Sequence, residues 1–367
     1  MTTLKSRRAR WAALTTAVLA VLVVSACSSN SSSSSSTPGG GSSSSSSSSA
    51  SLSGTLNGSG STFQLTFQQA ALSAFKSVQS GITVNYGGGG SGKGRTDLAS
   101  GVVNFAGSDS TIPAAELAGF KGKQVLYFPI VIGPITVSYN LSGVSKLQLS
   151  GPVIANIFQG KITTWNNSAI KADNPGVTLP STPIVIARRS DSSGTTSNFS
   201  KFLVAASGGA WTLGTSSTIK WPASSRGGSG NGGVAQIVKT TPGAIGYVDY
   251  STAKSTGLTF ASVKNSSGSY IAPSPTSATA AADHVTPKSD LTFSAIWASG
   301  AQSYPITYQS WDLVYQAQSS AQTAKDLQAY ISYLLGAGQQ LLPSLGYAPL
   351  PASLDQMAKT QLSKIGT

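Results

Sequence analysis

A serine tract over residues 28–53 limits which part of this chain can form a folded core. The tract is nearly all serine and is broken mainly by Thr37-Pro38-Gly39-Gly40-Gly41. Segments of this composition have too few apolar side chains to offset the entropy that is lost on ordering. We therefore expect residues 27–54 to form a flexible tether and the folded region to begin near residue 55. A glycosylated stalk is an alternative that predicts the same flexibility.

The residues before the tract have the pattern of an export signal. An apolar run over residues 11–24, too short to span a bilayer comfortably, follows four basic residues, Lys5, Arg7, Arg8 and Arg10. The run leads into Val24-Ser25-Ala26-Cys27, which resembles the lipobox of bacterial lipoproteins, although that pattern prefers Leu at the position of Val24. The resemblance implies a lipoprotein signal peptide at residues 1–26 and lipidation of Cys27. Two acyl chains would anchor the protein on the periplasmic or outer face of the cell membrane, because each buried methylene contributes about 0.8 kcal/mol.

The charge balance is basic both before and after the signal is removed. Loss of residues 1–26 takes away four basic and no acidic residues, so the formal net charge falls from +13 to +9. The remaining Lys and Arg residues are scattered, and no recognised nucleic-acid-binding motif is present. We expect no nucleic-acid partner but a general attraction for small anions.

The cysteine and histidine content argues against several kinds of site. Cys27 is the only cysteine and His284 the only histidine, so we expect neither an internal disulfide nor a zinc site. The sequence contains no G-x-S-x-G motif of a serine hydrolase. We therefore expect no metal and no cofactor.

Apolar, β-rich runs alternate with helical stretches from residue 55 onward. Strands are expected at 82–86, 125–137, 184–187 and 244–248, and helices at 64–78, 153–158, 196–204 and 234–238. This alternation is typical of an α/β fold. Since the region 55–367 is longer than one typical domain, we expect two lobes.

Three glycine-rich polar turns precede helical stretches and could each bind an anion. They cover residues 58–63, 87–95 and 188–196. Free backbone N–H groups and the positive end of the helix dipole favour an anion at such positions. Each turn taken alone could instead serve only to turn and cap the chain. The second nearly matches a nucleotide-binding P-loop, but Gly94 stands where a Ser or Thr is needed.

These turns occur in an order and spacing that resemble the phosphate-binding proteins of phosphate-specific ABC transporters. The resemblance runs from about Leu56 to the C-terminus and also rests on Gly107-Ser108-Asp109, Trp221-Pro222 and the motif at 242–247. It implies a two-lobed periplasmic-binding-protein-like fold of type II, with the ligand in a cleft between α/β lobes joined by two crossing strands. Lobe 1 would contain residues 55–137 plus 312–367, and lobe 2 residues 138–311. The crossings would lie near 137–140 and 308–314.

The resemblance also implies the residues that bind phosphate from lobe 1. Thr62 and Ser91 would donate through their hydroxyl groups and Phe63 through its backbone N–H. Asp109 would accept a hydrogen bond from protonated phosphate, which sulfate cannot give, and would thereby reject sulfate. A role for Asp109 in a cap or turn is the alternative.

From lobe 2, Arg189 resembles the guanidinium that pairs with phosphate oxygens, and Asp191 the carboxylate that orients it. Ser193, Gly194 and Thr195 would add hydroxyl and backbone N–H donors. A surface ion pair between Arg189 and Asp191 is the alternative.

The sequence departs from the family pattern at two places in lobe 1. Gln64 replaces a commonly seen proline, and a second serine is often present where Gly92-Lys93-Gly94 stands here.

Together these features predict an extracytoplasmic, lipid-anchored solute-binding protein that acts as a monomer and is not an enzyme. It would capture inorganic phosphate by cleft closure and deliver it to the membrane permease of an ABC-type importer. Three alternatives stay open: a secreted phosphate-ester hydrolase on the same scaffold, a binding protein for another oxyanion, and a surface adhesin.

Overall fold

The computed structural model describes residues 52–367. The predicted signal peptide, Cys27 and most of the predicted tether lie outside these residues. The strands are β1 (Gly54–Gly60), β2 (Ile82–Gly87), β3 (Phe105–Ser108), β4 (Val125–Tyr139), β5 (Gln148–Leu149), β6 (Val185–Arg189), β7 (Arg226–Gly228), β8 (Ala244–Asp249), β9 (Thr259–Phe260), β10 (Ser262–Lys264), β11 (Tyr270–Ile271) and β12 (Thr307–Tyr315).

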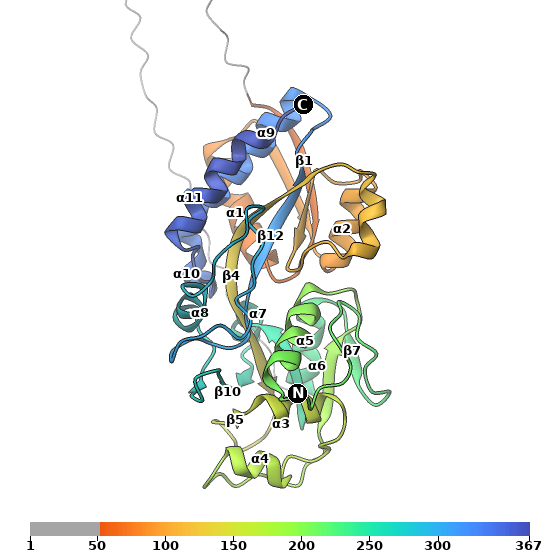
Figure 1. The fold of residues 1–367 in the computed structure, drawn as a ribbon, viewed down its shortest axis with the longest axis vertical. Coiled ribbons are helices and arrows are strands. Elements are labelled where there is room, and N and C mark those ends of the chain that lie inside the picture. The colour runs from red at the N-terminus through yellow and green to blue at the C-terminus, as the bar shows by residue number, and fades with distance from the viewer. Residues whose placement is uncertain (1–51) are drawn as a thin grey trace, which may run out of the picture. The chain divides into compact units, whose positions relative to one another are not determined.

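Helices alternate with these strands, as the sequence predicts (Figure 1). The α-helices are α1 (Leu65–Val78), α2 (Ser91–Ala99), α3 (Gly151–Phe158), α4 (Ser168–Asp173), α5 (Gly194–Ala206), α6 (Gly230–Thr240), α7 (Tyr250–Ser255), α8 (Pro275–Ala282), α9 (Ala321–Leu335), α10 (Leu342–Leu345) and α11 (Ala352–Gln361). Three 3₁₀ segments join them, η1 (Ala114–Phe120), η2 (Ala337–Leu341) and η3 (Leu362–Lys364).

The main sheet has the strand order β2-β1-β3-β12-β4-β8-β6-β7. We call the part with β2, β1, β3 and β12 sheet A, and the part with β8, β6 and β7 sheet B. In sheet A, β1 runs parallel to both β2 and β3, whereas β12 is antiparallel to β3 and β4. In sheet B, β6 runs parallel to β7 and β8. Parallel neighbours end at the same edge of a sheet, so the turns that follow β1 and β3 are brought together, and so are those after β6 and β7.

The strand β4 belongs to both sheets and joins them. It pairs with β12 as far as Pro134 and with β8 from Ile135 onward. Proline cannot donate a ladder hydrogen bond, so it is tolerated where pairing is irregular. Pro129 lies beside the register shift in the pairing with β12, and Pro134 lies where β4 changes its partner.

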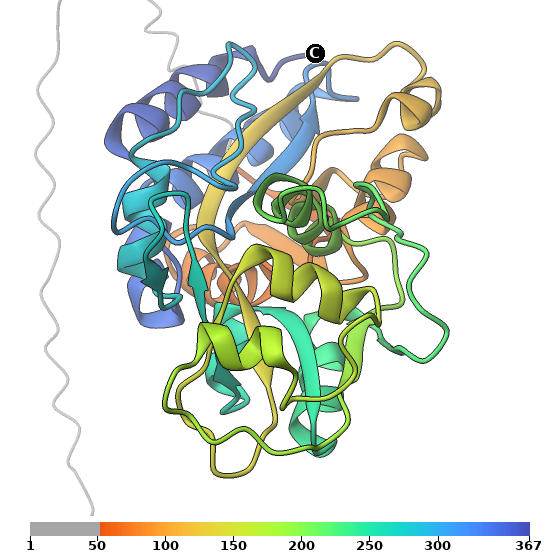
Figure 2. The ribbon, with the colours of Figure 1, turned by 60° about the horizontal axis from the view of Figure 1, so that its bottom comes forward.

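Helices cover both sheets. In sheet A, α1 packs on β2, α2 on β1 and β3, and α9 on β1, while α6 packs on β6, β7 and β8 of sheet B. Figure 2 turns the ribbon so that the yellow-green segment with α3 and α4 comes forward.

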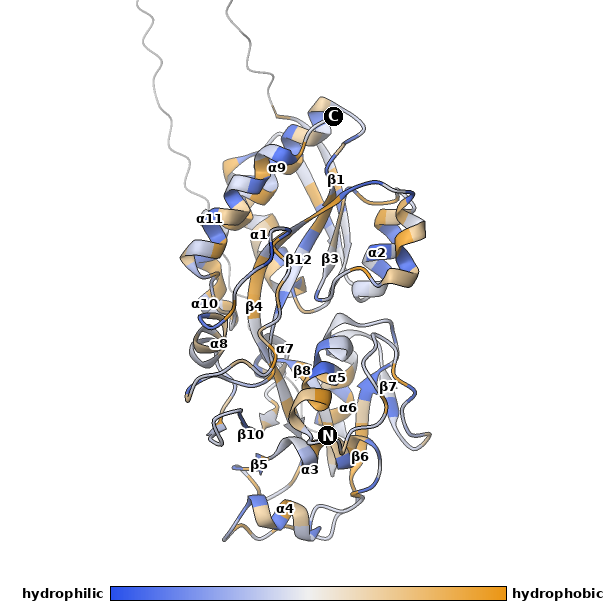
Figure 3. Ribbon diagram, in the orientation of Figure 1, coloured by the Kyte–Doolittle hydropathy of each residue, from blue (hydrophilic) through white to orange (hydrophobic). Residues whose placement is uncertain are grey.

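The apolar core follows β4 through the molecule. Nearly every residue of this strand is buried, and Figure 3 shows it as hydrophobic along much of its length. A strand that is buried on both faces reads as a continuous apolar run, which explains why its sequence does not alternate. Within the described residues, no helix combines the length and apolar character needed to cross a membrane.

Candidate anion-binding site

The segments that the sequence singled out meet at the ends of β1, β3 and β6. The backbone N–H of Gly194, at the start of α5, donates to the Ser91 hydroxyl at the start of α2 over 3.1 Å. The N–H of Gly92 donates to the Ser192 carbonyl over 3.0 Å. The two helix starts therefore face one another across the boundary between the sheet A and sheet B segments.

Glycine is required at position 194 by this close approach. A Cβ atom there would collide with the Ser91 hydroxyl and lie 2.7 Å from the Cβ of Asp109. Glycine is thus needed at position 194 because the two segments lie so close together. It is not needed for a backbone conformation that only glycine adopts readily.

Asp109 is buried among hydroxyl groups, with an exposed fraction of 1%. Its Oδ1 accepts from Ser310 Oγ over 2.7 Å and also from Ser61 Oγ. Its Oδ2 lies 3.4 Å from Ser91 Oγ, which in turn accepts from the Asp109 backbone N–H over 3.1 Å. Burial raises the pKa of Asp109, although the hydroxyl donors and the charge of Arg189 act in the opposite direction. The Asp109 carboxylate is thus a buried hydrogen-bond acceptor with hydroxyl donors around it.

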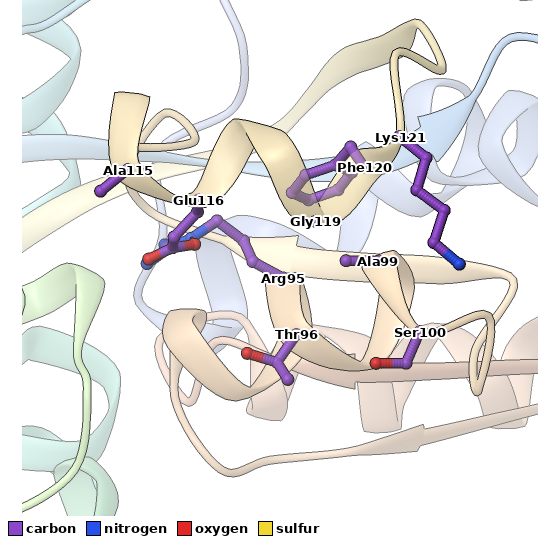
Figure 4. A pocket seen from close by; sticks show the side chains of 9 residues that line it. All are labelled: Arg95, Thr96, Ala99, Ser100, Ala115, Glu116, Gly119, Phe120 and Lys121. Atoms are coloured by element: carbon purple, nitrogen blue, oxygen red, sulfur yellow. The ribbon is translucent and has the colours of Figure 1, made fainter.

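Arg95 holds the segment on both sides of Asp109. Its guanidinium is fully buried and donates to the hydroxyls of Ser108 and Ser110 over 3.2 and 3.0 Å. Two further donors pair with Glu116 over 2.6 and 3.0 Å. Figure 4 shows the two charged side chains turned toward one another beside a cavity between α2 and η1. The bidentate pair fixes the guanidinium, which fixes the strand end that carries Asp109.

Arg189 is 3% exposed and is held by Asp191. Its Nε donates to Asp191 Oδ1 over 2.8 Å, and its Nη2 pairs with Oδ2. Asp191 also accepts from the Gly230 backbone N–H over 3.1 Å. Burial by itself would raise the pKa of Asp191, but the bonds and charge of Arg189 lower it overall. Asp191 therefore contacts a buried guanidinium, and its predicted role in orienting Arg189 stays a prediction.

Thr62 and Thr195 lie beside Arg189 and are joined through Asn231. The Thr62 hydroxyl accepts from Asn231 through both the backbone N–H and the side-chain amide, each over 3.2 Å. The same amide lies 3.4 Å from Thr195 Oγ1, as does Nη1 of Arg189. Ser193 caps α5, because its Oγ accepts from the Thr196 N–H over 3.1 Å.

Phe63 has two separate environments. Its backbone N–H donates to Ser61 Oγ over 3.0 Å, next to Asp109. Its ring packs in the core, with centroids 4.1 Å from Tyr308 and 5.3 Å from Tyr347. Only the backbone of this residue belongs to the candidate site.

The two departures from the family pattern have different consequences. Gln64 precedes α1, is fully buried, and donates to Ser310 Oγ over 3.2 Å, so it supports a hydroxyl that donates to Asp109. Lys93 pairs with Asp97 over 2.6 Å and is more than half exposed. Its charge is already paired on the surface of α2.

Five side chains were given no role from the sequence, although two of them lie within the predicted turns: Ser61, Arg95, Asn198, Asn231 and Ser310. Asn198 donates to the Asp109 carbonyl over 2.6 Å. Asn231 follows Ser229-Gly230 at the start of α6, a fourth turn of the strand-to-helix kind that could have been recognised. Ser310 lies within β12, where no local pattern marks it.

Comparison with known proteins identifies the family. A family model described as the PBP superfamily domain matches residues 45–337. Phosphate-binding protein PstS 3 of Mycobacterium leprae is 35% identical over 325 residues, which cover 85% of this chain and 87% of that protein. The chain belongs to the phosphate-binding proteins of the PBP superfamily. Another member, phosphate-binding protein PstS of Haemophilus influenzae, is 34% identical over 313 residues and covers 84% of this chain and 92% of its own.

Solved structures agree on the fold of this family. A high affinity periplasmic phosphate-binding protein, PfluDING, bound with phosphate, matches with a TM-score of 0.70 and 22% identity, covering 86% of this chain and 99% of that chain. The expected α/β fold of type II, typical of periplasmic binding proteins, is confirmed. The lobe boundaries and the phosphate-binding residues stay predictions.

Proposed function

We propose that this phosphate-binding family member captures inorganic phosphate outside the cytoplasmic membrane and delivers it to an ABC-type importer. One observation carries the proposal: the buried acceptor Asp109 and the buried cation Arg189 lie in one cluster of hydroxyl and N–H donors. A hydrogen phosphate ion needs this combination, since it has several acceptor oxygens and at least one donor hydroxyl.

Each predicted residue has a role that its contacts support. Arg189 is held in position by Asp191 and would give a fork of donors to two phosphate oxygens. Gly194 and Thr195, at the start of α5, would donate backbone N–H groups at the positive end of the helix dipole. Thr62, Ser91, Ser193 and the Phe63 N–H would complete the donor set.

Closure would follow from the placement of these groups. Ser91 and Asp109 belong to the sheet A segments, whereas Arg189 and Gly194 belong to the sheet B segments. An anion bound to both sets favours the arrangement in which they are close together. The bond from Asn198 to the Asp109 carbonyl would support that closed arrangement.

Selectivity would come from Asp109. A carboxylate that receives a hydrogen bond from phosphate is satisfied, whereas one that faces sulfate keeps an unpaired buried charge. The proposal therefore includes strong discrimination against sulfate.

Lipidation of Cys27 would tether a monomer to the outside of the cell membrane, within reach of the permease that receives the phosphate. The protein would act in binding rather than catalysis, because the relatives that it matches are phosphate-binding proteins.

Isothermal titration of the purified chain with phosphate and then sulfate tests this function. We expect one phosphate per chain and no heat from sulfate. Equal binding of both anions would point to a receptor for another oxyanion. No binding of either would leave the glycine-rich turns as helix caps.

A further inference from the structure

Lys201 is a cation that the proposed function does not use. It lies on α5, two turns beyond Gly194 and roughly 10 Å further along the helix. Its side chain is half-buried, and burial lowers its pKa. Within residues 52–367 it forms no ion pair. A cation that is drawn into the protein without a carboxylate partner favours an anion from solution.

Two cavities meet at Lys201. The outer one has a volume of about 440 Å³, and its lining includes Lys201, His284, Thr286, Lys288 and Thr292. The inner one has a volume of about 270 Å³, and its lining includes Ser110, Thr111, Ser197, Lys201, Ser216 and Ser217. Thr111 lines both. Both cavities have exposed residues in their lining, His284 and Lys288 in the outer one and Thr215 in the inner one. The inner one also contains the buried Ser110 and Ser197, so its buried side lies toward Asp109.

The lining of both cavities is rich in cations and hydroxyls. Among the described residues, no Asp or Glu lines either one. The nearby Asp290 accepts from the backbone and hydroxyl of Thr292 over 2.9 and 2.7 Å, so its charge is engaged beside the outer cavity. The cavity of Figure 4 differs, because its arginine, Arg95 on α2, is paired with Glu116 on η1, which lines the same cavity.

The inner cavity adjoins the candidate phosphate site. Ser110 directly follows Asp109, and Ser197 lies on the same helix face as Lys201, one turn closer to Gly194. The bond from Asn198 to the Asp109 carbonyl joins the two walls. Separation of these walls would connect the inner cavity to the Asp109 carboxylate.

We propose that the two cavities around Lys201 form an outer oxyanion site through which inorganic phosphate reaches Asp109 and Arg189. Lys201 and Lys288 attract the anion, and the hydroxyls of the inner cavity donate to it in transit. The site rests on the proposed phosphate function and adds a path of entry. It contains donors but no carboxylate acceptor, so it takes sulfate as readily as phosphate.

Stopped-flow measurement of phosphate association with the purified chain tests the outer site. Removal of one lysine charge that lines the path of a dianion should lower the association rate constant about two- to fourfold at low salt, the effect expected for charges that are roughly 10 Å apart in water. We expect this for Lys201→Met and for Lys288→Met, with unchanged dissociation and with the difference lost at high salt. Lys288 is exposed, so its replacement keeps the test valid if Lys201→Met folds poorly.

The matched control is Lys146→Met, which removes an exposed lysine that lines neither cavity. It should leave the association rate constant unchanged. Sulfate should slow phosphate association more than chloride at equal ionic strength, and this excess should disappear in Lys201→Met. Equal rates in the lysine variants and the wild type, or the same decrease in Lys146→Met, would overturn the outer site alone. Absence of phosphate binding by the wild type would overturn the proposed function with it.

Discussion

The side-chain amide of Asn198 donates a 2.6 Å hydrogen bond to the backbone carbonyl of Asp109. Asn198 belongs to α5 beside sheet B, and Asp109 follows β3 of sheet A. Both are buried. This bond thus links the two sets of segments that bear the candidate phosphate donors.

Loss of this link should weaken phosphate binding. A buried hydrogen bond contributes about 0.5–1.5 kcal/mol, and the Asp109 carbonyl would keep only the 3.4 Å contact with the Gln309 amide, so we expect Asn198→Ala to raise the Kd up to roughly tenfold. Isothermal titration measures this. Ser200→Ala is the control, because Ser200 is buried on the same helix but bonds to Ser197 and Ser216. A Kd that is equally unchanged in both variants would show that the link is not used in binding.

Replacement of Asp109 by Asn should remove the discrimination between anions. The Asn amide has nearly the same shape, carries no charge and can donate to an oxyanion. We expect Asp109→Asn to bind phosphate more weakly and to bind sulfate measurably, as seen by titration with each anion. Asp283→Asn, at an exposed position that follows α8, should keep the wild-type preference. Continued rejection of sulfate by Asp109→Asn would assign the selectivity to another group.

Replacement by lysine should weaken phosphate binding at Arg189 and leave it nearly unchanged at the neighbouring Arg188. Arg189 is buried and held by Asp191, so loss of its fork should cost roughly 2–4 kcal/mol of phosphate binding. Arg188 bonds instead to Ser225 and to the Arg189 carbonyl. Arg188→Lys should therefore bind phosphate nearly as the wild type does. A larger loss in Arg188→Lys than in Arg189→Lys, measured by titration, would reverse the assignment.

Sequence reasoning found those parts of the site that have a local signature. The turns at Gly58, Gly87 and Arg188 follow strands and precede helices, and glycine with hydroxyl residues marks such turns wherever they occur. The strands β2, β4, β6 and β8 were also predicted from a local signature, because a run of apolar residues indicates a buried strand. Their ends differed by a few residues, because pairing partners rather than composition decide where a strand stops.

The supporting residues were missed because their contacts are remote in sequence. Ser310 reaches Asp109 across 201 residues, and it lies in a strand where a serine has no distinguishing context. Arg95 is also an ordinary residue of α2 until Glu116, Ser108 and Ser110 are placed around it. The contact of Ser310 follows from the sheet order, in which β12 enters between β3 and β4, whereas the contacts of Arg95 depend on how α2 packs on β3 and η1. No local pattern encodes either arrangement.

The buried carboxyl of Asp312 should make the stability of the protein depend on pH. Asp312 is fully buried on β12, and both of its oxygens accept from the Gln68 amide over 3.2 and 3.1 Å. Burial raises the pKa of Asp312 to about 8, against 3.8 for the ordinary group, although Gln68 and Gln64 act in the opposite direction. Burial likewise raises the pKa of Asp249 to about 7.

Because these pKa values are raised, the folded state keeps protons that the unfolded state releases between about pH 4 and 8. The free energy of unfolding should therefore be highest below about pH 4 as far as these groups are concerned, and fall as the pH rises toward 8. We expect Asp312→Asn to flatten this decline and to be more stable than the wild type at pH 8, by an amount on the order of a few kcal/mol. Urea unfolding at a series of pH values measures it, with the exposed Asp283→Asn as control. Parallel curves for the wild type and Asp312→Asn would mean that Asp312 is ionised in the folded protein, with its charge offset by the amides of Gln64 and Gln68.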